Sequence, residues 1–272
     1  FRIINDADTI SGKKIICFSP HPDDTSISAG ASLAFFAQNN SVTSCCGTTG
    51  HRAFIPDANR EQRIAIREEE ATNEAKHIDA LAHFLRLPLY DRGSVCGEDD
   101  IKIVMDYLCE QNPDIIFLPH TGDAHPTHRA VEQAVLQSIS QILTSSPGKT
   151  FDIYMYEGPW SLFMKGSYNT IVSAPAEFHA KKLAAIRAHK SQIDRTPYDV
   201  AGTALSQLRG ALVPEQDLSG FGGEPPKLEE KLELFYFQTL TSPTEVQKLL
   251  LLLAECKPPT TEPDPLRMSS SQ

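Results

Sequence analysis

Short apolar segments typical of buried strands alternate with helical segments along most of the chain. The run at 13–19, KKIICFS, is mostly apolar and rich in β-branched residues, and prolines follow it directly. Residues 27–38, ISAGASLAFFAQ, then have the small and apolar composition of a helix that packs on a sheet. Strands of this kind are typical of a parallel sheet that helices cover. The alternation predicts an α/β fold, a Rossmann-like, mainly parallel sheet with helices on both faces.

The alternation continues through the rest of the chain. We expect further strands at 41–48, 83–87, 114–118, 151–156 and 232–240, and helices at 59–85, 99–111, 129–143, 175–188 and 243–255. The Gly- and Pro-rich segment 214–227 is expected to be a long surface loop, either a lid over a site or a plain connector. Residues 1–256 are predicted to form a single domain, and the polar residues 257–272 a disordered tail.

Charge and composition exclude two classes of partner. The 25 basic and 35 acidic residues give a net charge of -10, which would repel a phosphate backbone, so nucleic acid is not an expected partner. The longest aliphatic run, 249–253, is far shorter than the roughly 20 residues that a membrane span needs. The six cysteines form no C-x-x-C pair and several lie in apolar runs, which favours a reducing, cytoplasmic location.

Two histidine-rich loops follow strands of the predicted sheet. An HPDD motif at 21–24 follows the first strand, and an HPTH motif at 125–128 follows the strand at 114–118. Ligands of open α/β sheets bind beyond the carboxyl ends of the strands, so the fold alone would bring these loops together. A catalytic zinc takes three ligands from His, Asp or Glu and leaves one position for water. The HPDD motif offers two ligands and a further carboxylate that could take a proton from that water.

Each motif alone also has a purely structural interpretation. An HPDD string at a strand end can be a proline turn with an aspartate as helix cap. His125 and His128, taken singly, are more often surface or capping residues than ligands. Their joint occurrence with HPDD, each after a buried strand of one sheet, favours a site. We therefore predict that the two motifs converge on one divalent cation.

Four segments together resemble the PIG-L/LmbE-like family of zinc-dependent N-acetylglucosamine deacetylases. They are SPHPDD, AHPTHRA, the R-x-x-E of 67–70 and the AHKSQ of 188–192. The chain is similar in particular to the deacetylase-like branch that is sometimes joined to a glucosamine-6-phosphate deaminase. The resemblance implies a hydrolase that removes an N-acetyl group from a small-molecule amino sugar. It is compatible with a homo-oligomer and with fusion to a deaminase domain.

The same resemblance assigns roles to the residues of the two motifs. It implies that His21, Asp24 and His128 bind Zn²⁺, with another divalent metal as the alternative. It implies that Asp23 is the general base. His125 would then stabilise the oxyanion or protonate the leaving amine.

Three further residues match family positions near the sugar-binding pocket, namely Arg67, Asp91 and His189. For Arg67 the alternative is an ordinary helical arginine paired with an acidic residue on a neighbouring turn. For His189 the alternative is a helix-terminal histidine that the helix dipole favours.

Two threonines depart from the family pattern. Thr25 and Thr127 stand where the family often has an acidic residue. A carboxylate commonly orients a ligating histidine, so metal affinity is expected to differ unless His120 or Asp123 replaces it. For His120 and Asp123, simple hydrogen bonding within the loop is the preferred interpretation. Trp160 follows a strand end and could wall the sugar, although an aromatic residue there is more often packing.

Two other functions are alternatives to the hydrolase. One is a non-catalytic sugar-binding or regulatory module of a larger amino-sugar enzyme, which the departures at Thr25 and Thr127 would suit. Metal content and acetate release distinguish this module from a hydrolase. The other, a nucleotide-binding Rossmann domain, is disfavoured because no G-x-G-x-x-G follows the first strand.

Overall fold

The structure is a computed structural model that describes residues 2–164, 166–217 and 228–255. Its strands are β1 (Arg2–Ile4), β2 (Lys14–Ser19), β3 (Ser41–Cys46), β4 (Leu81–Phe84), β5 (Ile115–Pro119), β6 (Phe151–Tyr156), β7 (Thr170–Val172) and β8 (Glu233–Leu240). Its α-helices are α1 (Asp24–Phe36), α2 (Arg60–His77), α3 (Glu98–Gln111), α4 (Pro126–Ser145), α5 (Ala176–Arg187), α6 (Lys190–Ile193), α7 (Tyr198–Asp217) and α8 (Pro243–Glu255).

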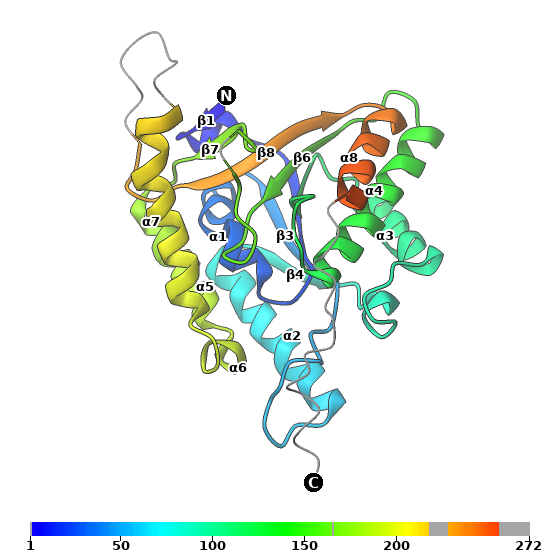
Figure 1. The fold of residues 1–272 in the computed structure, drawn as a ribbon, viewed down its shortest axis with the longest axis horizontal. Coiled ribbons are helices and arrows are strands. Elements are labelled where there is room, and N and C mark those ends of the chain that lie inside the picture. Colours follow the sequence, from blue (N-terminus) through cyan, green and yellow to red (C-terminus); the bar gives the residue numbers. More distant parts are fainter. Residues whose placement is uncertain (1, 165, 218–227, 256–272) are drawn as a thin grey trace.

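One sheet contains all of these strands, with helices on both of its faces (Figure 1). The strand order is β1-β7-β8-β6-β5-β2-β3-β4. Only β8 runs antiparallel to its neighbours, β6 and β7, and the other described pairs are parallel. The predicted α/β fold with a mainly parallel sheet is confirmed.

The alternating side chains of β2 show how the sheet separates two hydrophobic cores. Ile16 and Phe18 belong to the core that includes Val131 of α4, together with residues of α3 and α8. Ile15 and Cys17 belong to the opposite core, under α1 and α5. Both faces of β2 are buried, which explains its continuous apolar sequence. Full burial of a side chain such as Phe18 contributes about 2 kcal/mol to stability.

The order of the strands places the two histidine motifs at one point of the sheet edge. From β2 the chain moves outward through β3 and β4, and it then returns to place β5 and β6 on the other side of β2. This reversal opens a crevice at the carboxyl ends of β2 and β5. The HPDD motif directly follows β2, and the loop that leads to the HPTH motif follows β5.

Several predicted boundaries are wrong. The helix predicted at 59–85 ends at His77, because Asp79 has a left-handed backbone (φ 54°) and the chain turns there into β4. Helices α1 and α4 each begin three residues earlier than predicted, at Asp24 and Pro126. The HPDD and HPTH motifs therefore contribute to helix starts.

The sequence patterns did not predict β1, β7 or α7. Of the loop expected at 214–227, residues 214–217 belong to α7, and 218–227 lie outside the described residues. The expected disordered tail, 257–272, also lies outside them. Within the described ranges, every helix is too short or too polar to cross a bilayer.

Candidate metal centre

The start of α1 leaves the carboxylate of Asp23 free of a capping role. Asp23 is the N-cap residue of α1, but its side chain makes no capping hydrogen bond. The hydroxyl of Ser19 accepts from the backbone N–H of Thr25 at 3.0 Å, and the carboxylate of Glu74 accepts from that of Ser26 at 2.7 Å. These groups satisfy donors of the helix N-terminus. Asp23 therefore does not cap α1 through its side chain.

The start of α4 fixes the orientation of His125. This residue is the N-cap, and its Nδ1 accepts from the backbone N–H of Thr127 at 3.3 Å. Pro126 occupies the first helical position, where its missing N–H costs nothing. A neutral imidazole that accepts at Nδ1 carries its proton on Nε2. Nε2 of His125 is therefore a hydrogen-bond donor.

Three side-chain atoms, one each from His21, Asp24 and His128, form a compact triangle. Nδ1 of His21 lies 3.2 Å from Oδ2 of Asp24 and 3.3 Å from Nε2 of His128. The third side, from Oδ2 of Asp24 to Nε2 of His128, is 3.2 Å. Zinc bonds of about 2.0–2.2 Å in tetrahedral geometry place two ligand atoms about 3.3–3.5 Å apart. The triangle fits a single metal ion of this kind.

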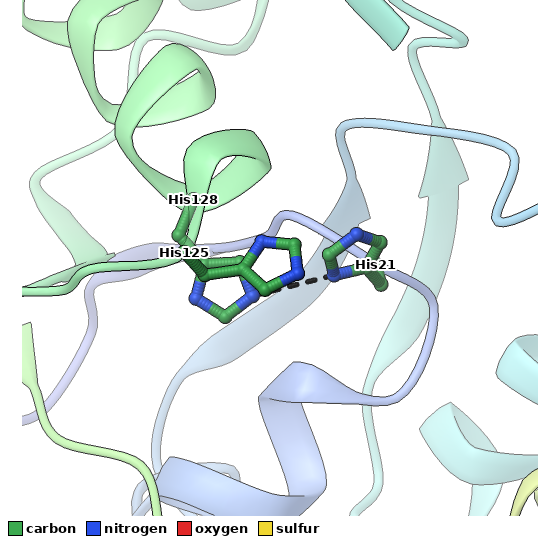
Figure 2. A group of neighbouring side chains, drawn as sticks. All are labelled: His21, His125 and His128. Atoms are coloured by element: carbon green, nitrogen blue, oxygen red, sulfur yellow. Dashed lines mark hydrogen bonds between the residues drawn. The ribbon is translucent and has the colours of Figure 1, made fainter. Parts of the chain in front are cut away.

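A second grouping replaces Asp24 with His125. Ring nitrogens of His21, His125 and His128 all lie within 4.8 Å of one another. Figure 2 shows His21 on the loop after β2 and the other two rings at the start of α4, with a dashed line between His21 and His128. The triangle with Asp24 is tighter, and Nδ1 of His125 already caps α4. The geometry favours Asp24 as the third ligand.

The pKa values of Asp24, His128 and His125 are shifted in different directions. Burial raises the pKa of Asp24, but His128 and His21 outweigh it and hold this pKa well below its usual range. Burial lowers the pKa of His128, but the carboxylates of Asp24 and Asp123 raise it to about 10. Burial and the neighbouring His21 and His128 lower the pKa of His125 to about 4. At neutral pH the chain by itself thus holds an ionised Asp24–His128 pair beside a neutral His125.

Asp123 orients His128 from the side away from the triangle. Its Oδ2 accepts from Nδ1 of His128 at 2.7 Å and from the indole N–H of Trp160 at 3.2 Å. Its Oδ1 accepts from the backbone N–H of His125 at 2.8 Å. A carboxylate in this position fixes the tautomer and the ring orientation of a ligating histidine. Asp123 therefore does more than the simple loop hydrogen bonding that we expected.

The two threonine departures lie away from the triangle. Thr25 is fully buried, and its hydroxyl accepts from that of Ser44 at 3.1 Å. The hydroxyl of Thr127 forms a hydrogen bond with that of Ser94 at 2.9 Å. The ring of His120 contacts Ser161, Phe163 and the backbone N–H of Gly122, and no described hydrogen bond joins it to His128. The orienting carboxylate is thus present in the chain, at Asp123.

Arg67 holds one oxygen of Asp23. Its Nη2 donates to Oδ1 of Asp23 at 2.9 Å, and its Nη1 lies 3.7 Å from Glu70. Only 2% of Arg67 is exposed, so it is not an ordinary arginine on a helix surface. Oδ2 of Asp23 has no hydrogen-bond partner among the described residues. The guanidinium therefore fixes the carboxylate and leaves its second oxygen available.

A cavity of about 480 Å³ opens at this point, within the range of small-molecule sites. All the predicted metal and catalytic residues line it, and so does Arg67. These residues are His21, Asp23, Asp24, His125 and His128. The structure thus brings together the side chains of the two motifs.

Asp91 and His189 do not line the cavity. The carboxylate of Asp91 is exposed, accepts from Arg60 at 2.9 and 3.1 Å, and lies 3.4 Å from Nε2 of His51. His189 is 1% exposed, and its Nε2 lies 3.3 Å from Glu74. The structure thus does not place either side chain in the lining of the cavity.

Trp160 lines the cavity and also packs against neighbouring aromatic rings, so both interpretations of its sequence position apply. Its ring packs edge-to-face against His128, with centroids 5.5 Å apart, and against Tyr198 of α7, at 6.3 Å. The loop that carries it is held by Glu157, whose carboxylate accepts two hydrogen bonds from Arg209 of α7. The position of Trp160 after a strand allowed a place in the cavity wall, but the contribution of α7 to this wall was not predicted.

Comparisons with known proteins identify a family model and relatives that are similar to this chain. The family model described as PIG-L, GlcNAc-PI de-N-acetylase, matches residues 16–139, which include both motifs. YaiS, an uncharacterized deacetylase of Escherichia coli strain K12, is 30% identical over 191 residues, covering 66% of this chain and 91% of that protein. A putative glucosamine-6-phosphate deaminase-like protein of Bacteroides thetaiotaomicron is 26% identical in a match of 246 residues. The match covers 68% of this chain. The chain spans 37% of the length of that relative.

Solved structures share the fold. The N,N'-diacetylchitobiose deacetylase of Pyrococcus horikoshii superposes with a TM-score of 0.62 at 21% identity, over 83% of this chain and 84% of that one. GalB, a 4-carboxy-2-hydroxymuconate hydratase of Pseudomonas putida, superposes with a TM-score of 0.63 at 17% identity, over 83% of this chain and 95% of that one. Because a hydratase and a deacetylase share it, the fold alone does not determine the reaction. The match along nearly all of YaiS, with the family model spanning both motifs, shows that this chain belongs to the PIG-L family.

Proposed function

We propose that this protein is a metal-dependent N-deacetylase that hydrolyses the N-acetyl group of an amino sugar, and that its metal is zinc. The triangle of His21, Asp24 and His128 carries the proposal, because its three sides match the ligand spacing of a tetrahedral site. Membership of a family described as GlcNAc-PI de-N-acetylase supports the reaction and the class of substrate.

A zinc ion held by these three residues would supply Lewis-acid activation of the acetyl carbonyl and of the attacking water. Asp24 and the two histidines supply one negative charge in total, which leaves the centre cationic and suited to that task. The hydrogen bond from Nδ1 of His128 to Asp123 would leave Nε2 of this ring available to hold such an ion.

Asp23 is the general base in this proposal. It lines the cavity beside the triangle, and Arg67 holds its Oδ1 so that Oδ2 can accept a proton from water. The water oxygen bonds to the acetyl carbon, the C–N bond breaks, and the proton is passed to the departing nitrogen. The products are acetate and a free amine.

His125 stabilises the negative charge that develops on the acetyl oxygen. Its Nδ1 caps α4, so its Nε2–H is available to donate. A pKa of about 4 keeps this ring neutral at pH 7, which suits a hydrogen-bond donor better than a carrier of an extra proton. Of the two roles that the resemblance implied, we therefore propose oxyanion stabilisation.

We further propose a cytoplasmic setting and a functional link to an amino-sugar deaminase. Buried free thiols at Cys17, Cys45 and Cys46 suit a reducing compartment. The longer, deaminase-like relative from Bacteroides supports the link, either as a fused domain or as a separate partner.

Release of amine from N-acetylglucosamine derivatives tests the proposed function. We expect release by the purified protein to stop after verified metal removal with a chelator and to return when zinc is added. A non-catalytic sugar-binding module would bind these compounds and release neither amine nor acetate. Undiminished release from fully metal-depleted protein would contradict the metal-dependent mechanism.

A further inference from the structure

Two arginines line the cavity, and only one of them has a carboxylate partner among the described residues. Arg67 is paired with Asp23, as described above. Arg52 also lines the cavity, but none of the ion pairs of the described residues includes it. Its guanidinium carbon lies 4.7 Å from the ring centroid of Tyr90, in a cation–π contact. This contact orients the guanidinium and leaves its N–H groups free of a carboxylate.

The loop that carries Arg52 lies tightly against the HPDD motif. Gly50 has a left-handed backbone with φ 63°. A Cβ at this position would lie 2.9 Å from Cδ of Pro22 and 3.0 Å from Nε of Arg67, so a larger residue would push the loop away. Glycine thus allows the close approach that places Arg52 beside the metal-binding loop.

Arg52 and His21 both contact the ring of Tyr90. The ring centroid of Tyr90 lies 5.9 Å from that of His21 and 4.7 Å from the guanidinium carbon of Arg52. All three side chains line the same cavity, so Arg52 lies in the part of the wall next to the triangle. A sugar whose acetamido group lies at the triangle can therefore reach Arg52 with a group at another ring position.

Two further arginines lie near Arg52, although the chain as a whole carries a charge of -10. Burial and the nearby Arg60, Arg52 and Arg63 lower the pKa of the neighbouring His51, and Asp91 acts in the opposite direction. The carboxylate of Asp91 is already paired with Arg60.

We infer that the cavity takes an amino sugar that carries an anionic substituent, a phosphate or a carboxylate, and that Arg52 binds this group. The inference rests on the proposed function for the position of the acetamido group. A guanidinium offers two parallel N–H donors to either anion, and such charge-assisted bonds are stronger than neutral ones. Arg52 is then the residue that selects charged over neutral amino sugars.

Selectivity between neutral and anionic substrates tests the role of Arg52. We would measure kcat/KM for N-acetylglucosamine, for its 6-phosphate and for N-acetylmuramic acid, a carboxylate. The wild type should prefer at least one anionic compound by about tenfold or more. The compound that is preferred distinguishes a phosphate from a carboxylate. In Arg52→Gln the preference should fall to near unity, and Arg52→Lys should retain part of it because the charge remains.

Arg195→Gln is the matched control. Arg195 lies over Phe54, does not line the cavity, and should not affect the preference. Equal kcat/KM for all compounds in the wild type, or an unchanged preference in Arg52→Gln, would overturn the inference.

A binding measurement separates this inference from the proposed function. Calorimetric titration of the wild type and Arg52→Gln with glucosamine 6-phosphate and with glucosamine requires no turnover. Arg52-dependent binding of the phosphate without any hydrolysis would reject the proposed function and keep the anion site. Hydrolysis with no role for Arg52 in either measurement would reject the anion site and keep the proposed function.

Discussion

Asp123 and His128 are joined by a 2.7 Å hydrogen bond between two buried side chains, from Nδ1 of the imidazole to Oδ2 of the carboxylate. The opposite nitrogen of the same ring lies 3.2 Å from Asp24 and 3.3 Å from His21. The carboxylate of Asp123 thus contacts one nitrogen of the ring, and the carboxylate of Asp24 lies close to the other. Asp123 lies in the loop after β5 and fixes the ring of His128. The geometry of the proposed centre therefore depends on a residue that is not itself a proposed ligand.

Replacement of Asp123 by alanine should weaken metal binding. Loss of the carboxylate frees the tautomer and the orientation of His128, which typically costs about 10–100-fold in metal affinity. Competition with a chromophoric chelator measures the dissociation constant. His120→Gln is the control, since His120 lies in the same loop and no described hydrogen bond joins it to His128. An Asp123 variant that binds zinc as tightly as the wild type would show that this hydrogen bond is not needed.

Replacement of Asp23 by asparagine should separate catalysis from metal binding. The amide keeps the size of the side chain but cannot take a proton, so we expect turnover to fall about 10²–10⁴-fold with the metal retained. Steady-state kinetics and elemental analysis of the same sample measure both. Asp91→Asn, at an exposed carboxylate outside the cavity, should change turnover far less. Wild-type turnover in Asp23→Asn would remove this residue from the mechanism.

The parts of the site that sequence could predict are those set by strand ends. HPDD and HPTH each follow a buried strand, and parallel strands of one sheet end at the same edge. The pattern of β2 and β5 therefore sufficed to bring His21 and His128 together. The resemblance to a family then supplied roles that the pattern alone left open.

The parts that sequence could not predict depend on contacts between distant side chains. Asp23 has the sequence position of a helix cap, and only the contacts of Ser19 and Glu74 with α1 show that it is not one. The strand end before Trp160 suggested a place near the site, but the pairing of Arg209 of α7 with Glu157 in the same loop is one that no periodicity marks. Such contacts become visible only once the helices are placed.

Loss of a buried ion pair away from the site should lower the stability of the fold more than loss of an exposed pair. Lys182 and Glu233 lie 2.6 Å apart and are each about 3% exposed in their side chains. Lys182→Met would leave Glu233 buried without its partner, which typically costs about 3–5 kcal/mol. Urea unfolding measures the loss. Lys181→Met removes the neighbouring exposed pair with Asp79 and should cost about 1 kcal/mol or less. Equal effects of the two variants would contradict this assignment.

His179 should make the fold sensitive to acid. Burial lowers its pKa from 6.5 to about 4, and its Nε2 contacts the backbone oxygen of Lys231. Because the folded pKa lies below the unfolded one, this contribution to stability is present above pH 6.5 and is lost as the pH falls toward 4. The full contribution is about 3 kcal/mol.

Unfolding free energies at several pH values between 7.5 and 4 measure this dependence. His179→Gln can still donate to the Lys231 oxygen but does not titrate, so its stability should fall less steeply than that of the wild type over this range. Parallel curves for the two proteins would show that His179 does not titrate between the folded and unfolded states in this way.

The metal content of two histidine variants tests the centre most directly. His128→Ala and His125→Ala each remove one ring from the start of α4, and elemental analysis after dialysis against zinc gives the ions bound per chain. If His21, Asp24 and His128 are the ligands, His125→Ala should retain about one zinc ion per chain, as the wild type does, and His128→Ala should retain almost none. Zinc retained by His128→Ala and lost from His125→Ala would contradict the account.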